Sequence, residues 1–140
     1  MSHRITPSIL LIAAFGATAL PAGAAELCAE VIVENVRPQQ GQLLVAAYGS
    51  AQAFGKTALA QHRVAAGEAR TVFKLCNLSG SEIALTLFQD LDSDGKMARN
   101  LLGVPSEPWG ASGSPGTFGP SWDTARVALD GKPIVIRLSQ

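Results

Sequence analysis

The sequence carries little charge, and positive and negative residues are equally frequent. Only 16% of its 140 residues are Asp, Glu, Lys or Arg, and 11 basic residues offset 11 acidic ones. Proteins that bind nucleic acids or anionic membrane surfaces usually have a basic excess. Because this chain has none, we expect neither as a partner. Low-complexity tracts and internal repeats are also lacking, which argues against a repeat architecture.

Histidine and long apolar runs are scarce as well. The chain has two histidines, and only His62 lies beyond the N-terminal segment. The sequence supports no Ser-His-Asp or Cys-His arrangement around it, so we expect a protein that is not an enzyme. The apolar run over residues 9–15 is too short to cross a membrane comfortably, and no second long run follows.

The N-terminal segment has the three parts of an export signal. Arg4 gives a positive start, residues 9–15 an apolar centre, and residues 21–25 (PAGAA) a run of small residues suited to signal peptidase. We predict a cleaved signal peptide over residues 1–25 and a single domain over residues 26–140. The expected location is the periplasm or the cell exterior, with no membrane span after cleavage.

Cysteine occurs only twice, as Cys28 and Cys76. In an exported chain an even number of cysteines is typical of disulfides, so we predict one bridge between them. The alternatives are a metal pair or two buried thiols, but CxxC spacing and neighbouring histidines are missing.

Most of the remaining chain alternates between apolar and other residues, which is the period of a β-strand. Residues 50–61 are the one place where a short helix could form, and residues 91–122 show no clear strand. Asp130-Gly131 predicts a hairpin between the last two strands. The pattern therefore predicts an all-β fold, an antiparallel β-sandwich of immunoglobulin-like or transthyretin-like type, with about seven strands and one long ordered loop. The expected strands cover residues 27–34, 43–48, 69–76, 83–88, 126–129 and 133–138.

The disulfide also predicts a strand register. If Cys28 faces Cys76 in antiparallel strands, Glu30 faces Lys74, and further opposite-charge and β-branched pairs follow. Such cross-strand pairs are favourable, so we expect these strands to be neighbours, with the bridge on their outer face. The opposite faces should form the core, made of Leu27, Val31, Val33, Leu43, Val45, Phe73, Leu75, Leu85, Leu87, Val127, Ile134 and Ile136.

An acidic loop follows the strand expected over residues 83–88. Asp90, Asp92 and Asp94 alternate and are closed by Gly95, as in loops that wrap oxygen ligands around Ca²⁺. The bidentate Glu of an EF-hand is missing, because the twelfth position is Leu101.

Two later side chains are candidates to complete the coordination shell, Asn100 and Glu107. The alternative is a plain turn, since Asp and Gly dominate turns for conformational reasons alone. Both interpretations stay open, and Ca²⁺ is the only cofactor that the sequence suggests.

The chain resembles a bacterial family of exported proteins, the domain of unknown function numbered 2141. Its central pattern, DxNxNGKLDxNxLGIPxEGYG, is matched here by DLDSDGKMARNLLGVPSEPWG, and the match extends over nearly the whole mature chain. The resemblance implies a small exported β-sandwich with no established activity. The family's aspartate after NGKL is Ala98 here, which removes a loop carboxylate, and Pro108 replaces a glycine. The matching positions are residues 41–48, 54–56, 90–96, 100–105, 107, 109–110, 112, 118–120 and 125.

Three aromatic residues lie in the long loop: Trp109, Phe118 and Trp122. They are candidates to stack on sugar rings or to anchor a protein partner. Alternatively they are plugs that cover one end of the sandwich and hold the loop in place.

Two functions therefore remain. The first is a non-catalytic binding or structural module for an unidentified protein or glycan. The second is a small metal-dependent hydrolase that uses the acidic loop. An open, concave acidic site would favour the hydrolase, whereas carboxylates turned onto backbone amides would favour the binding module.

Overall fold

The computed structural model describes residues 26–116 and 119–139; the predicted signal peptide, residues 1–25, lies outside the described residues. Within this part of the chain no helix is long and apolar enough to cross a membrane. The elements are β1 (Leu27–Glu34), β2 (Gln42–Tyr48), β3 (Ala60–Ala65), β4 (Arg70–Leu78), β5 (Glu82–Asp90), β6 (Trp109–Ala111), α1 (Trp122–Ala125), β7 (Arg126–Ala128) and β8 (Ile134–Arg137).

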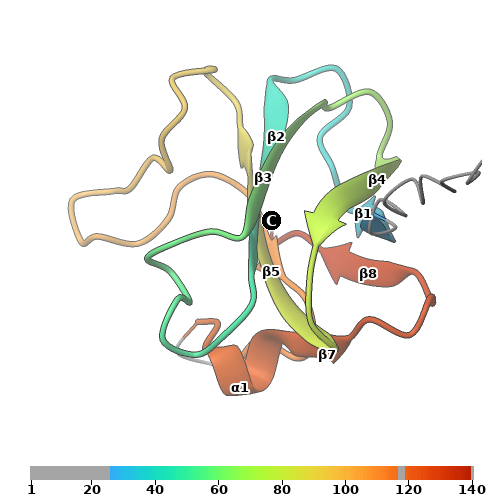
Figure 1. Cartoon of the computed structure of the whole chain (residues 1–140). Helices are drawn as coiled ribbons and strands as arrows, with labels where there is room; N and C mark the ends of the chain where they lie inside the picture. Colours follow the sequence, from blue (N-terminus) through green and yellow to red (C-terminus); the bar gives the residue numbers. More distant parts are fainter. Residues whose placement is uncertain (1–25, 117–118, 140) are drawn as a thin grey trace, which may run out of the picture.

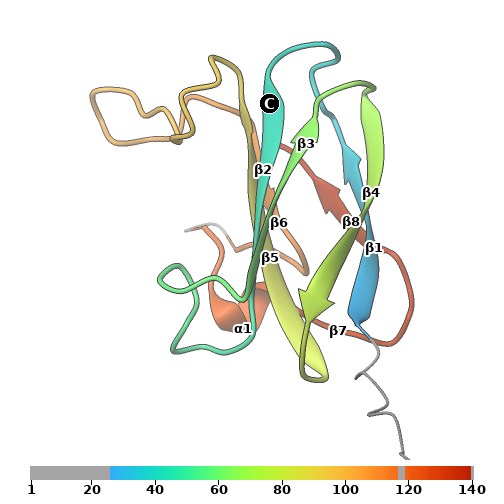
Figure 2. The same ribbon diagram turned by 45° about the horizontal axis from the view of Figure 1, so that its top comes forward.

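The strands form two sheets that face each other (Figures 1 and 2). Sheet A has the order β4-β1-β8, and sheet B has the order β3-β2-β5-β6, with β7 also paired to β5. The predicted β-sandwich is confirmed. Pairing is antiparallel except between β1 and β8, which run parallel.

The hydrophobic core lies between the sheets, where alternate residues of each strand point inward. Eleven of the twelve predicted core positions are confirmed; Phe73 and Val127 among them are only partly buried but pack against the cluster. The prediction that Leu27 belongs to the core is wrong, because this residue is 40% exposed. It is the first residue of β1, and a register shift between Leu27 and Ala29 interrupts the alternation there.

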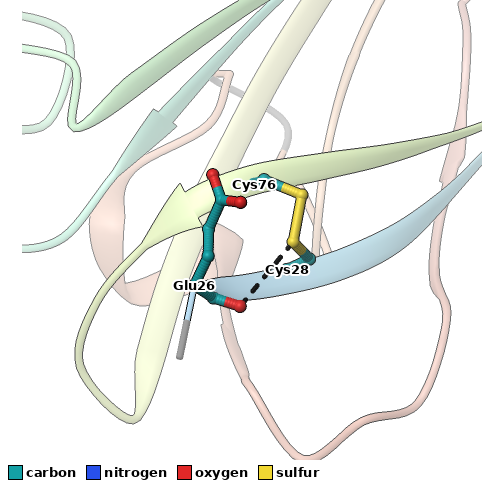
Figure 3. A group of neighbouring side chains, drawn as sticks. All are labelled: Glu26, Cys28 and Cys76. Atoms are coloured by element: carbon teal, nitrogen blue, oxygen red, sulfur yellow. Dashed lines mark hydrogen bonds between the residues drawn. A yellow bond between two sulfur atoms is a disulfide. The ribbon is translucent and has the colours of Figure 1, made fainter. Parts of the chain in front are cut away.

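The predicted register of β1 against β4 is confirmed from Glu30 opposite Lys74 to Glu34 opposite Arg70. Cys28 and Cys76 form a disulfide with a Cα–Cα distance of 4.0 Å, and both residues are half-buried (Figure 3). Glu26 lies beside the bridge, but both sulfurs are used in it, so the group offers no thiolate to a metal. The bridge indicates an oxidising, extracytoplasmic environment.

No helix forms within residues 50–61. Turns occupy residues 51–56, and Ala60–Ala65 forms β3, an edge strand paired with β2. The side chains of Gln61, His62 and Arg63 are all exposed, so this strand lacks the alternation that would have indicated it. Residues 91–122 contain one strand that the sequence pattern did not indicate: Trp109–Ala111 forms β6 and pairs with β5.

The predicted hairpin at Asp130-Gly131 is also wrong. The turn itself exists, with the Asp130 carboxylate accepting from the amide of Lys132 at 3.1 Å. However, β7 before it pairs with β5 in sheet B, while β8 after it pairs with β1 in sheet A. A turn sequence predicts that the chain reverses, but it does not decide which sheet each arm joins.

Candidate functional site

The end of β5 carries two polar side chains that are completely buried, Gln89 and Asp90. The Gln89 amide accepts from the backbone amide of Arg37 at 2.9 Å and donates to the carbonyls of Arg37 and Gln40, each at 2.7 Å. It therefore fixes the connection between β1 and β2. Sequence analysis did not identify Gln89, because nothing in the residue pattern distinguishes it from a surface glutamine.

Asp90 organises the start of the following loop. One of its carboxylate oxygens accepts from the amide of Asp94 at 3.1 Å; the other accepts from the amide of Gly95 at 2.9 Å and from the side chain of Gln42 at 3.1 Å. Gly41 packs so closely on the Asp90 backbone that a Cβ at residue 41 would collide with its carbonyl oxygen. The loop thus begins from a rigid base.

Glu107 closes the same loop from its far end. Its side chain is buried, and its two oxygens accept from the amides of Leu91 at 2.8 Å and Ala98 at 2.9 Å. Carboxylate oxygens of Asp90, Asp92 and Glu107 all lie within 4.8 Å of one another. We call these three residues the acidic clasp and residues 91–108 the arm. The clasp holds both ends of the arm together.

The other two predicted metal ligands do not belong to the acidic clasp. Asp94 is exposed and accepts from the amide of Lys96 at 2.7 Å. Asn100 is also exposed and accepts from the amides of Leu102 at 2.9 Å and Val104 at 3.1 Å, which shapes a separate turn at the tip of the arm. Of the five predicted ligands, the structure therefore brings together Asp90, Asp92 and Glu107.

The pKa values of Asp90 and Asp92 are shifted in opposite directions. Burial opposes ionisation of Asp90, but the hydrogen bonds from Gln42 and from the amide of Gly95 outweigh it, so the pKa of Asp90 lies below its ordinary value. The amide of Asp94 lowers the pKa of Asp92, but desolvation, the adjacent Asp90 carboxylate and nearby negative charges together raise it above the ordinary value. Asp92 is therefore the first of the pair to take up a proton.

The backbone amides restrict the chemistry of the clasp. Hydrogen bonds occupy both oxygens of Asp90 and of Glu107, so these groups serve to order the chain. A metal-dependent hydrolase needs an open coordination position for water or substrate. The closed arrangement does not favour that alternative. Three carboxylates so close together nevertheless match the ligand type of a hard cation.

A groove lies on the outer face of sheet B, the face turned away from sheet A. Strand pairing places residues of four strands in one row, because Leu44 faces both Arg63 and Phe88, and Phe88 faces Trp109. The next row is small in the middle, since Ala46 faces Thr86. The floor of the groove is this outer face of sheet B. It is hollowed where the small side chains of the second row lie beside the large ones of the first.

Two segments outside the strands line this groove. The arm, which projects from one side of sheet B in Figure 2, contributes Met97, Leu102 and Val104. The segment before α1 contributes Gly119 and Pro120. The cavity has a volume of about 1050 Å³. We call it the outer groove.

The three aromatic residues predicted to bind a partner do not lie together. Trp109 is half-buried and lines the outer groove. Trp122 packs on the small cluster of Ala84, Ala111 and Ala125, as expected of a plug. Phe118 lies outside the described residues. The groove itself was not predicted, because its rows depend on pairing β3 and β6, the two strands that sequence analysis missed.

Sandwich, clasp and groove together define a small disulfide-linked β-domain that has a walled groove on one sheet. The chain belongs to a bacterial family described as "Uncharacterized protein conserved in bacteria (DUF2141)", whose model matches residues 31–137. This confirms the resemblance seen in the sequence. Comparisons with curated proteins and with solved structures found no significant match.

Proposed function

We propose that this chain is an exported, non-catalytic binding domain and that its ligand lies in the outer groove. The observation that carries the proposal is the groove itself: about 1050 Å³, with an apolar floor and walls supplied by separate loops. Small-molecule sites are concave, mostly apolar and largely pre-formed, with few polar groups. The disulfide supports a location in the periplasm or outside the cell.

The acidic clasp has a defined role in this proposal. The arm supplies one wall of the groove, yet Leu101 and Leu102 at its tip are 106% and 87% exposed, so packing does not hold the tip. Its position depends on hydrogen bonds to Asp90 and Glu107 at its base. The clasp therefore keeps a binding wall in place, which accounts for buried carboxylates without catalysis.

The proposal is tested by filling the groove. Ala46→Trp places a large ring on the small part of the floor, so we expect it to reduce binding of the neutral apolar dye Nile red at least tenfold. Val72→Trp is the matched control, because Val72 is 45% exposed and belongs to β4 of sheet A. Equal dye binding by the two variants, with unchanged melting temperatures, would contradict the proposal.

A cation is a second candidate ligand, at the acidic clasp. The observation that favours it is the cluster of three carboxylates, whose oxygens lie within 4.8 Å of one another. A bound Ca²⁺ would offset their mutual repulsion. Asp90, Asp92 and Glu107 would supply its side-chain ligands, and with hydrogen bonds already on these groups we expect weak affinity, about 10⁻⁴–10⁻³ M.

A further inference from the structure

The outer groove has cationic side chains but no anionic ones among the described residues that line it. Arg63 and Arg99 contribute guanidinium groups, and no Asp or Glu is part of the lining. Neither arginine forms an ion pair with a described carboxylate. Arg99 is committed to the arm, donating to the carbonyl of Gly103 at 2.9 Å. Arg63 is exposed on edge strand β3, and its guanidinium lies beside Gly95 of the arm.

Arg63 stands at one end of an apolar row. The row continues through Leu44 and Phe88 to Trp109, one side chain from each of four neighbouring strands. With adjacent strands about 4.8 Å apart, the row spans roughly 14 Å. This is a track for an extended hydrocarbon chain, with a positive charge at one end.

The arm adds more apolar surface above this track. Leu102 is 87% exposed and Val104 is 52% exposed, and both line the groove. Besides the two arginines, Tyr48, Gln61, His62 and Thr86 bring polar side chains to the lining. A glycan would leave the exposed side chains of Leu102 and Val104 without an apolar partner. An aliphatic chain would cover them.

We propose that the ligand of the outer groove is a fatty acid; this rests on the function proposed above. Its carboxylate pairs with the Arg63 guanidinium, a charge-assisted contact that can be bidentate. Its hydrocarbon chain lies along Leu44, Phe88 and Trp109, under the arm. The positive charge of Arg63 favours an anionic head group, and the apolar row favours a hydrocarbon tail.

The experiment compares two ligands that share a tail and differ in the head. Decanoate and decan-1-ol are titrated into a Trp122→Phe background, where the emission of Trp109 reports binding in the groove. We expect decanoate to bind at least tenfold more tightly than decan-1-ol. Arg63→Gln should remove this difference by weakening decanoate alone. Arg70→Gln, an exposed arginine on β4 of sheet A, is the matched control and should change neither affinity.

The outcomes separate the two proposals. If both ligands bind equally and Arg63→Gln changes neither, the fatty acid is overturned while the groove remains a binding site. The same conclusion follows if neither ligand binds but Nile red still does, and a peptide or glycan would then be the class to examine. If decanoate, decan-1-ol and Nile red all fail to bind the folded protein, both proposals are overturned.

Discussion

The carboxylate of Glu107 accepts a hydrogen bond from the amide of Leu91, sixteen residues earlier in the chain, at 2.8 Å. Its second oxygen accepts from the amide of Ala98 at 2.9 Å. One buried side chain therefore ties the start, the middle and the end of the arm. The arm forms one wall of the outer groove. The hydrogen bonds to Glu107 therefore stabilise the loop and also maintain the shape of the groove.

Glu107→Ala should lower the free energy of unfolding by about 2–3 kcal/mol, because it leaves two backbone donors without their charged acceptor. Glu107→Gln keeps one carbonyl acceptor and should fall between the alanine variant and the native protein. Glu68→Ala, at an exposed position, is the control and should stay within about 0.5 kcal/mol. Urea unfolding measures all three. If Glu107→Ala and Glu68→Ala have the same midpoint, Glu107 does not hold the arm.

The opposite pKa shifts of Asp90 and Asp92 predict a pH dependence. The pKa of Asp92 is raised above 3.8, so the folded state binds its proton more tightly than the unfolded state does, and this residue adds stability as the pH falls from neutrality. The pKa of Asp90 is lowered, so its contribution is complete above 3.8 and is lost as the pH falls through its folded pKa.

Asp92→Asn isolates the first of these effects. Between pH 7 and pH 4 the native protein should gain melting temperature relative to the variant, because only the native protein relieves a disfavoured charge by protonation. Thermal melts of both proteins across this range measure the difference. Parallel curves would show that Asp92 titrates in the folded protein as it does in the unfolded chain.

Leu85 tests the position of the core. Its side chain is completely buried on β5, so Leu85→Ala should cost about 2–5 kcal/mol of unfolding free energy through lost burial and the cavity left behind. Val72→Ala, at a position 45% exposed, should cost much less. Denaturant melts compare them. An unchanged midpoint for Leu85→Ala would contradict the described packing of the sheets.

Calcium tests the acidic clasp as a cation site. At a free Ca²⁺ concentration several times a millimolar Kd, binding to the folded state alone should add about 1 kcal/mol of stability and raise the melting temperature. Asp92→Ala should abolish this rise. If melts in Ca²⁺ and in chelator coincide, or if the variant shows the same rise, the clasp serves only to order the arm.

Local patterns predicted much of the fold. Alternation identified the inward faces of β1, β2, β4, β5 and β8, and the cysteine spacing predicted how β1 pairs with β4. Alternation did not identify strands in which inward and outward side chains are not clearly distinguished by burial. Exposed side chains concealed β3, β6 has only three residues, and the turn at Asp130-Gly131 joins two sheets instead of two paired strands.

The candidate site was less predictable for the same reason. Alternating carboxylates indicated an acidic loop, and the carboxylate of Glu107, a candidate ligand, lies within 4.8 Å of those of Asp90 and Asp92. Whether each oxygen would meet a cation or a backbone amide depends on how the chain folds around Asp90, and no spacing rule decides that. The outer groove depends on the register of four strands, two of which leave no clear signal in the sequence.

Amide chemical shifts of the folded protein, recorded with and without the neutral dye Nile red, test the proposed binding site most directly. The account predicts that the largest changes occur at Ala46, Thr86 and Phe88 on the outer face of sheet B. Val72 and Val135, exposed on sheet A, should not shift. Changes centred on sheet A, or no changes at concentrations that keep the protein folded, would contradict the claim that the outer groove binds a ligand.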